Sequence, residues 1–442
     1  MTSFDNVLFD NILLVTPASG SGFTILKNAM VAVLDGFFAY VGTDYNSAVA
    51  SLSGKSFNRY DGRNKLIWPA MANTHSHIPM TLMRNMADDL NLHDWLFNLI
   101  FPMEKKLRQE HVYWGSKLGI AEMIRNGTGA AADMYYFGDA VAQAAQESGF
   151  RLNVCCDGKS DGADGKLHVS KNLLRDFCEQ WQHGSDGLIN TSLLVHSIYL
   201  YDSYLYSEMS EMASDLEVYI QVHVSETQKE VDECIAKYGC RPPEQLEKFG
   251  IFNGRTIAAH CVHLNDDDRR ILADRQVCVA HNPSSNLKLG SGIADIKSMI
   301  DAGICVSLGT DGAASNNSLN LYNEMRLASL LAKGINLDAG CLPAEELIRI
   351  ASLNGMKSLG FENTGCIEAG WTADLQILDI DRPAMSPLGN PDAALVYSSD
   401  SGFVESLMVN GKWLMLKHEL ETIDEEKVIF EANRCSSEIA LN

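Results

Sequence analysis

At 442 residues the chain is long enough for one large domain with a smaller one beside it. Its 35 Lys and Arg stand against 57 Asp and Glu, and the net charge of −22 argues against nucleic-acid or anionic-membrane partners. No apolar run approaches the ~20 residues that a membrane span needs. The N-terminal stretch has no signal-peptide pattern, and the eleven scattered cysteines form no C-x-x-C pair, so we expect reduced thiols in a cytoplasmic protein.

Both ends of the chain carry short apolar runs separated by turns. In the N-terminal part, Asp35-Gly36 joins two such runs and predicts a β-hairpin. In the C-terminal part, Asn410-Gly411 is a second hairpin signal, and the other runs expected to be strands are 373–378, 394–397 and 404–409. We therefore predict that residues 1–65 and 363–442 pair into one small β-sandwich domain.

The central part, residues 66–362, alternates apolar β-rich runs with amphipathic helical stretches such as Glu110 to Arg125. Alternation of this kind is typical of a parallel sheet, and nearly continuous apolar strands indicate that both faces are buried. The expected fold class is α/β, a (β/α)8 TIM-like barrel with its active site at the C-terminal strand ends. The expected strands are 66–75, 128–136, 151–157, 191–197, 217–225, 256–262, 276–281 and 303–311.

The first of these strands ends in His75-Ser-His77, and residues spaced i, i+2 on a strand point to the same face. Alone the pair is weak evidence, because single histidines in a barrel are usually core or loop residues. Three further residues, His223, His260 and Asp311, each end a later apolar run. Imidazoles with one carboxylate suit a divalent metal, so we predict one per chain, zinc being preferred and ferrous iron the alternative.

Such a metal would acidify a bound water toward neutrality. Glu226 lies three residues after His223, just beyond the expected strand end. This position suits a carboxyl group that carries a proton between water and a substrate nitrogen. Spacing alone does not tell whether His260 ligates the metal.

Five motifs together resemble the amidohydrolase superfamily, and within it the 5'-methylthioadenosine/S-adenosylhomocysteine deaminase family. The matching stretches extend from the first barrel strand to the last and are Asn73–His77, His223–Glu226, Ala259–Leu264, His281–Gly290 and Leu308–Asn317. The resemblance implies metal ligation by His75, His77, His223 and Asp311, with His260 orienting the attacking hydroxide instead. It further implies hydrolytic deamination of an adenine nucleoside, in which Glu226 protonates ring N1 and Asp311 helps to expel ammonia.

The same resemblance assigns substrate contacts to three residues. Glu104 would accept hydrogen bonds from the ribose hydroxyls, although its place beside Lys105 and Lys106 also fits a solvated carboxylate at a helix start. His196, at the end of the fourth expected strand, would face the substrate. Trp95 would cover an apolar 5' group, and a core tryptophan is the ordinary alternative.

One departure from the family pattern bears on substrate choice. Relatives that take S-adenosylhomocysteine place arginines in and after the third strand, where residues 155–166 of this chain offer only Lys159 and Lys166. A lysine is a point charge and lacks the two-pronged geometry of a guanidinium. Two alternatives stay open: a deaminase or chlorohydrolase of another heterocycle (guanine, pterin or triazine), and a scaffold protein without activity. The sequence also leaves open whether the chain forms a homo-oligomer.

Overall fold

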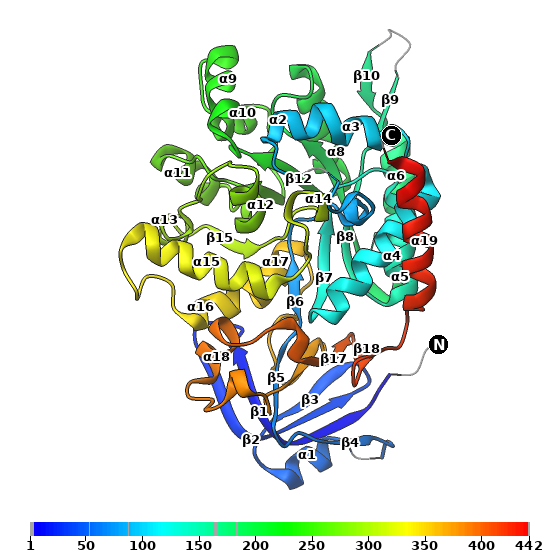
Figure 1. The fold of residues 1–442 in the computed structure, drawn as a ribbon, viewed down its shortest axis with the longest axis vertical. Coiled ribbons are helices and arrows are strands. Elements are labelled where there is room, and N and C mark those ends of the chain that lie inside the picture. Colours follow the sequence, from blue (N-terminus) through cyan, green and yellow to red (C-terminus); the bar gives the residue numbers. More distant parts are fainter. Residues whose placement is uncertain (1–3, 53, 87, 162–165, 183, 441–442) are drawn as a thin grey trace.

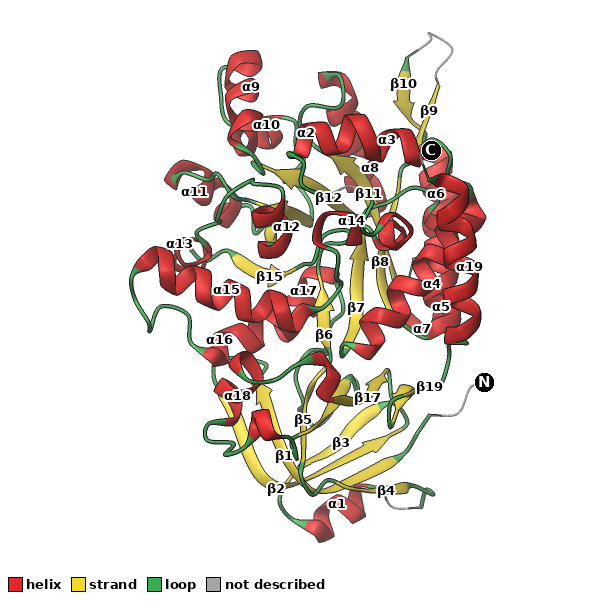
Figure 2. Cartoon of the chain, viewed as in Figure 1, coloured by secondary structure: helices red, strands yellow, loops and turns green. Residues whose placement is uncertain are grey.

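The computed structural model describes residues 4–52, 54–86, 88–161, 166–182 and 184–440. The chain builds a barrel of parallel strands surrounded by helices, and a nine-stranded sheet lies at one end of it (Figures 1 and 2). The first and last strands of the chain meet in that sheet, shown in blue and in orange to red in Figure 1. The predicted fold class is confirmed.

The eight-stranded sheet runs in the order β15-β14-β13-β12-β11-β8-β7-β6, and each neighbouring pair is parallel. Its strands are almost wholly buried, as expected when side chains fill the interior and helices cover the outside. They are β6 (Met71–Asn73), β7 (Thr128–Asp133), β8 (Arg151–Cys156), β11 (Ile189–His196), β12 (Tyr219–Val224), β13 (Thr256–His260), β14 (Cys278–His281) and β15 (Cys305–Leu308).

Hydrogen bonds just beyond the first and last strands close this sheet into a barrel. The Thr74 amide donates to the Leu308 carbonyl at 2.8 Å, and the Asp311 amide donates to the His75 carbonyl at 3.0 Å. Gly309 lies in this seam, where a Cβ would come within 2.9 Å of the His75 backbone, so the approach requires glycine. Closure of the barrel therefore brings the segment of His75 and His77 beside that of Asp311.

Most of the helices lie around the barrel. Those between successive strands are α4 (Gln109–Arg125), α5 (Gly138–Ser148), α6 (Lys171–Trp181), α7 (Gly184–Gly187), α8 (Ser203–Leu216), α9 (Gln228–Tyr238), α10 (Pro242–Lys248), α11 (Asp266–Asp274), α12 (Pro283–Lys288) and α13 (Ile296–Asp301). After β15 follow α14 (Ala313–Asn316), α15 (Leu321–Asn336), α16 (Ala344–Arg349), a π-helical turn (Ile350–Asn354) and α17 (Gly355–Leu359). Within the described residues, no helix combines the length and the apolar character needed to cross a membrane.

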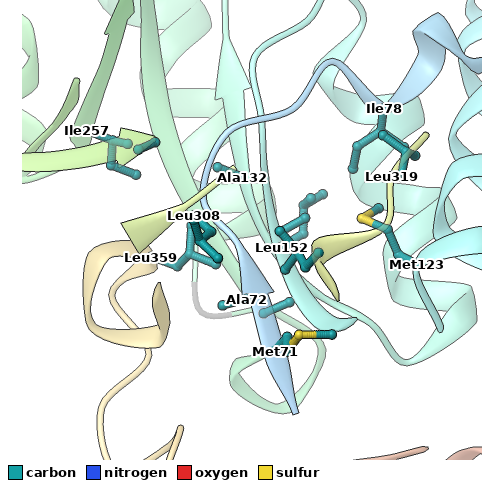
Figure 3. Close-up of a cluster of buried hydrophobic side chains, with 14 of the residues drawn as sticks. Met71, Ala72, Ile78, Met123, Ala132, Leu152, Ile257, Leu308, Leu319 and Leu359 are labelled. Atoms are coloured by element: carbon teal, nitrogen blue, oxygen red, sulfur yellow. The ribbon is translucent and has the colours of Figure 1, made fainter. Parts of the chain in front are cut away.

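Figure 3 shows how the barrel core is assembled from several elements. Leu152 comes from β8, Leu308 from β15, and Leu359 from α17, which lies beside Leu308. All three side chains are fully buried in the main hydrophobic cluster. Met123 from α4 and Leu319, which precedes α15, extend the cluster on the other side of β6.

The nine-stranded sheet runs in the order β19-β18-β17-β16-β5-β1-β2-β3, with β4 also paired to β1. It curls over itself, because the Phe38 amide of β3 donates to the Trp371 carbonyl, just before β16, at 2.8 Å. Phe9 and Met408, from the two ends of the chain, share one buried cluster. The strands are β1 (Val7–Pro17), β2 (Phe23–Leu34), β3 (Phe37–Gly42), β4 (Asn58–Asp61), β5 (Lys65–Pro69), β16 (Leu375–Asp379), β17 (Val404–Val409), β18 (Lys412–Leu416) and β19 (Glu419–Leu420); the short helix α1 (Tyr45–Ser51) precedes β4.

Two expected strands differ in the structure. The run 66–75 is divided: β5 pairs with β1 and β16, and the chain enters the barrel as β6 only after Ala70. Both halves are buried, so one apolar run serves two sheets. The prediction of a strand at 394–397 is wrong, because these residues belong to helix α18 (Pro391–Tyr397). Pro391 is the first residue of that helix, a position where proline is favoured.

A helix that the sequence analysis did not predict ends the chain. Asp424 caps α19 (Glu425–Ile439), and its side chain accepts from the Lys427 amide at 3.1 Å. The helix lies within residues 363–442 but packs along α4 of the barrel, as Figure 1 shows in red. Arg125 of α4 hydrogen-bonds to Glu425 at 2.6 Å, which ties the two helices together.

Candidate active site

The strand-end residues meet at one end of the barrel. His223 lies in β12, His196 and His260 are the last residues of β11 and β13, and His75, His77 and Asp311 follow β6 and β15. His196, His260 and Asp311 have φ of 64°, 70° and 63°. Few non-glycine residues adopt this left-handed conformation, and it is frequent at functional sites. Here it turns these side chains at the points where their strands stop.

Five of these side chains form two overlapping groups that could hold a metal ion. The ligand atoms of His75, His77 and His223 lie within 4.8 Å of one another, as do those of His75, His260 and Asp311. Asp311 Oδ1 lies 3.4 Å from His75 Nε2 and 3.1 Å from His77 Nε2. All of these residues are buried or nearly so.

The hydrogen bonds behind the imidazoles fix their tautomers. His77 Nδ1 lies 2.6 Å from the Met134 carbonyl, and His223 Nδ1 lies 2.9 Å from the His196 carbonyl. A carbonyl only accepts, so each Nδ1 carries the proton and each Nε2 presents a lone pair. His75 Nε2 is buried and has no hydrogen-bond partner. Lone pairs that converge on a carboxylate oxygen need a cation between them, and the residues present therefore fit a divalent metal.

Burial and neighbouring charges shift the pKa values of these residues. Burial lowers the pKa of His77, but the hydrogen bond to Asp311 outweighs it and raises that pKa to about 9. Burial lowers the pKa of His75 to about 4 and that of His223 well below its usual range. The pKa of Asp311 lies well below its usual range, since the neighbouring His75 and His77 outweigh the effect of its burial.

Asp311 is itself held by two hydroxyl groups. Its Oδ2 accepts from Ser285 Oγ at 2.6 Å and from Ser315 Oγ at 2.8 Å. These bonds leave Oδ1 to face His75 and His77. A ligand that is oriented by its own hydrogen bonds holds a metal more tightly than a free one.

Glu226 lies beside this centre with few polar partners. It accepts from Ser291 Oγ at 3.2 Å, and its other oxygen lies 3.7 Å from His260 Nε2. His260 Nδ1 lies 2.8 Å from Asn286 Oδ1, which directs His260 Nε2 toward Glu226. Burial raises the pKa of Glu226. A carboxyl group with a raised pKa holds its proton to a higher pH than an exposed one, which suits general acid–base chemistry.

A pocket lies in front of these groups. The predicted substrate residues Trp95, Glu104 and His196 all line it, together with His223, Glu226 and Asp311. Trp95 belongs to a π-helical turn (Trp95–Ile100) between α2 (Leu92–Asp94) and α3 (Phe101–Glu104), and its indole is 4% exposed. The other lining residues are His77 and His260, the tyrosines Tyr135, Tyr136 and Tyr199, and the apolar Met80, Leu92, Leu96, Phe101, Met134, Leu194 and Leu289.

Glu104 and His196 take their character from this pocket. Burial raises the pKa of Glu104 to about 7, although the neighbouring Tyr135 hydroxyl partly opposes the shift. Burial, with the nearby charges of His77 and Lys159, lowers the pKa of His196 to about 3, and its Nδ1 lies 3.0 Å from Ser197 Oγ. His196 is therefore a neutral imidazole.

The side chain of Lys159, in the segment after β8, is already engaged with other groups of the protein. Its side chain is 3% exposed and forms an ion pair with Asp157. The ammonium also donates to the Leu194 carbonyl at 3.0 Å and lies 4.8 Å above the Tyr201 ring. Lys166 Nζ lies 5.4 Å from the centre of the Tyr204 ring. Residues 162–165 of this loop, which include one of its aspartates, are outside the described residues.

A sequence profile of the amidohydrolase family matches residues 66–414. The chain belongs to the amidohydrolase family. It is 40% identical over 435 residues to a 5-methylthioadenosine/S-adenosylhomocysteine deaminase of Acetivibrio thermocellus, covering 98% of this chain and 99% of that protein. A protein of the same name from Dictyoglomus turgidum is 43% identical over 384 residues, 86% of this chain and 90% of that protein. The resemblance found from the motifs is confirmed.

Solved structures agree with this assignment. An adenosine deaminase from Xanthomonas campestris with bound zinc superposes with a TM-score of 0.89 at 31% identity, covering 98% of each chain. Atrazine chlorohydrolase from Arthrobacter aurescens, complexed with zinc, has a TM-score of 0.87 at 22% identity over 97% of this chain and 100% of that one. The second similarity shows the fold alone. This amidohydrolase is a hydrolytic enzyme with a site for a divalent metal.

Sequence reasoning missed the residues that support the site from behind. Glu230 of α9 accepts from the Ser225 and Glu226 amides, each at 2.8 Å, and so fixes the turn that carries Glu226. Asn286 of α12 orients His260, and Asp133 at the end of β7 accepts from the Ile78 amide at 2.7 Å. Glu230 lies four residues after Glu226, and Asn286 lies inside the motif His281–Gly290. The spacing of these residues in the sequence does not predict a supporting role for either.

Proposed function

We propose that this amidohydrolase deaminates adenine nucleosides hydrolytically, giving the inosine analogue and ammonia, with 5'-modified adenosines among its substrates. The observation that carries the proposal is one pocket that is lined by His77, His223 and Asp311 of the metal-binding cluster, by the acid Glu226 and by the carboxyl Glu104. The names of the relatives at about 40% identity support it. A scaffold protein without activity would have no need to keep these three functional groups together in one pocket, so their presence argues against that alternative.

We assign His75, His77, His223 and Asp311 as the metal ligands. Zinc is the proposed ion, supported by nitrogen-rich ligands and by the adenosine deaminase that was solved with bound zinc. When bound, the ion supplies Lewis-acid activation of water.

All eleven cysteines are free thiols, in keeping with the predicted cytoplasmic location.

The chain's own residues then carry the proton transfers. Glu226 gives its proton to ring N1 as an oxygen adds to C6, so that the C6–N1 double bond becomes a single bond. His260, held by Asn286, orients the attacking oxygen from the other side. Asp311 takes a proton from that oxygen and helps to pass it to the amino group, and ammonia leaves as the C6–N bond breaks. The ring thereby gains a carbonyl at C6 and keeps the proton on N1, and the next water returns a proton to Glu226.

The rest of the pocket binds the nucleoside. Glu104 in its ionised form accepts hydrogen bonds from the ribose hydroxyls, and the neutral His196 offers one ring nitrogen to the purine. Trp95 covers the 5' substituent. The walls around Trp95 are mostly apolar, which favours a small apolar group there.

The test is a panel of nucleosides and other heterocycles incubated with zinc-loaded protein and scored for ammonia or chloride. Adenosine, 5'-deoxyadenosine and 5'-methylthioadenosine are expected to release ammonia. Guanine, a pterin and a chlorotriazine are the competing substrates, and turnover of one of them in preference to every adenine nucleoside would contradict the proposal. A Glu226→Gln sample run in parallel excludes a contaminating deaminase.

A further inference from the structure

A second buried carboxylate lies behind the metal site and contacts neither the pocket nor the proposed ligands. Glu324, in the first turn of α15, is 1% exposed. One oxygen accepts from the Ser284 amide at 3.0 Å, and the other accepts from Asn316 Nδ2 at 2.9 Å. The two donors come from different segments, α12 and α14. Glu324 thus joins two stretches that are about thirty residues apart in the chain.

Each donor is the neighbour of a serine that holds Asp311. Ser284 precedes Ser285, and Asn316 follows Ser315, and both of these hydroxyls donate to Asp311 Oδ2. Asn316 Nδ2 also donates to the Thr310 carbonyl at 2.7 Å, directly before Asp311. Every link from Glu324 to Asp311 therefore consists of two hydrogen bonds and one step along the chain.

We propose that Glu324 is a positioning residue for Asp311: it fixes both serines, so that Asp311 keeps Oδ2 engaged and presents Oδ1 to His75 and His77. The inference rests on the proposed metal site, because its consequence is the geometry of one ligand. Glu324 touches neither substrate nor metal, and it acts only through the two serine segments.

Simple helix packing does not account for a carboxylate at this place. An acidic group in the interior must give up its water shell, and burial raises the pKa of Glu324 to about 7 despite its donors. An apolar side chain would fill the same space without that cost. It would leave the Ser284 amide and the Asn316 side chain without their acceptor.

The primary test is the zinc affinity of Glu324→Gln, measured by competition with a chromophoric chelator, which requires no substrate. Supporting hydrogen bonds of this kind typically contribute 10–100-fold to metal affinity, so we expect a loss in that range. The matched control is Glu122→Gln. Glu122 accepts from the Leu319 amide at 2.9 Å on the same loop and pairs with Arg84, but it has no bond to the serine segments. Its zinc affinity is expected to match that of the wild type.

A double-mutant cycle separates positioning from general destabilisation. If Glu324 acts through the serines, its replacement should cost much less affinity in a Ser285→Ala/Ser315→Ala background than in the wild type. Equal losses in both backgrounds, or a zinc affinity of Glu324→Gln within about threefold of the wild type, would overturn the inference. Should Glu324→Gln fail to fold, Asn316→Ala removes one arm of the link and is expected to weaken zinc binding through the same cycle.

The result also separates this inference from the proposed function. A wild-type protein that binds one zinc per chain but deaminates no adenine nucleoside would refute the function, and the affinity cycle would still test Glu324. A wild-type protein that binds no zinc would refute the metal site and this inference with it.

Discussion

Replacing Glu226 by Gln tests the proposed proton transfer with little change in shape. Gln keeps an oxygen that can accept from Ser291 Oγ, now at 3.2 Å, but it cannot release a proton. General acid–base catalysis contributes typically ~10²–10⁴-fold, which corresponds to about 2.7–5.4 kcal/mol of barrier. We expect kcat to fall by at least ~10²-fold, with zinc content unchanged because Glu226 is outside the ligand cluster.

Stability provides an internal check on that variant. Burial raises the pKa of Glu226 above its unfolded value, so the carboxyl favours folding at low pH, and this contribution is lost as pH rises through the folded pKa. A neutral Gln has no such loss, and the variant should melt no lower than the wild type above neutral pH. The control is Glu233→Gln, the same chemical change at an exposed position of α9. Retained zinc together with a kcat within tenfold of the wild type would remove Glu226 from the mechanism.

Two further predictions concern the metal and the ribose. His75→Ala should lose zinc and activity together, and zinc should no longer raise its melting temperature; full zinc content by elemental analysis would refute the ligand assignment. Because burial raises the pKa of Glu104 to about 7, the ionised acceptor is present above that pH, so KM for nucleosides should fall as pH rises through about 7. A Glu104→Gln enzyme should show a higher KM without that dependence, and an unchanged pH profile of KM would contradict the assignment.

The catalytic end of the barrel could be predicted because it follows from topology. Parallel strands all finish at one edge, so polar residues at the ends of apolar runs must meet there. His75, His223, His260 and Asp311 satisfy this rule in the structure. Their separate roles do not follow from it. The ligand atom of His260 lies in the same cluster as those of His75 and Asp311, and its orienting role stays a prediction.

Where prediction failed, the deciding contacts come from distant parts of the chain. In the sequence, β5 and β6 look like one strand because both are buried. They differ only in their pairing partners: β5 pairs with β1 and β16, and β6 pairs with β7. Helix α19 depends on α4, which lies three hundred residues earlier. Glu324 supports Asp311 through a backbone amide, a contact for which side-chain spacing gives no signal.

The last prediction concerns the 5' substituent of the nucleoside. A homocysteine tail carries a carboxylate that would need a cation near the loop after β8. Lys159 is already paired with Asp157 and bonded to the Leu194 carbonyl, so it must break these contacts before it can serve. Loss of the contacts of this buried lysine, which is 3% exposed, would offset much of what a new pair with the tail could add.

A small apolar group has no such cost, since it buries against Trp95 and its apolar neighbours at about 25 cal/mol per Å². We therefore expect kcat/KM for 5'-methylthioadenosine or 5'-deoxyadenosine to exceed that for S-adenosylhomocysteine, measured side by side on one preparation. Lys159→Met should leave the ratio between the substrates nearly unchanged. An advantage of tenfold or more for S-adenosylhomocysteine that disappears in Lys159→Met would show that the lysine leaves Asp157 to bind the tail, and the reasoning from its existing contacts would be wrong.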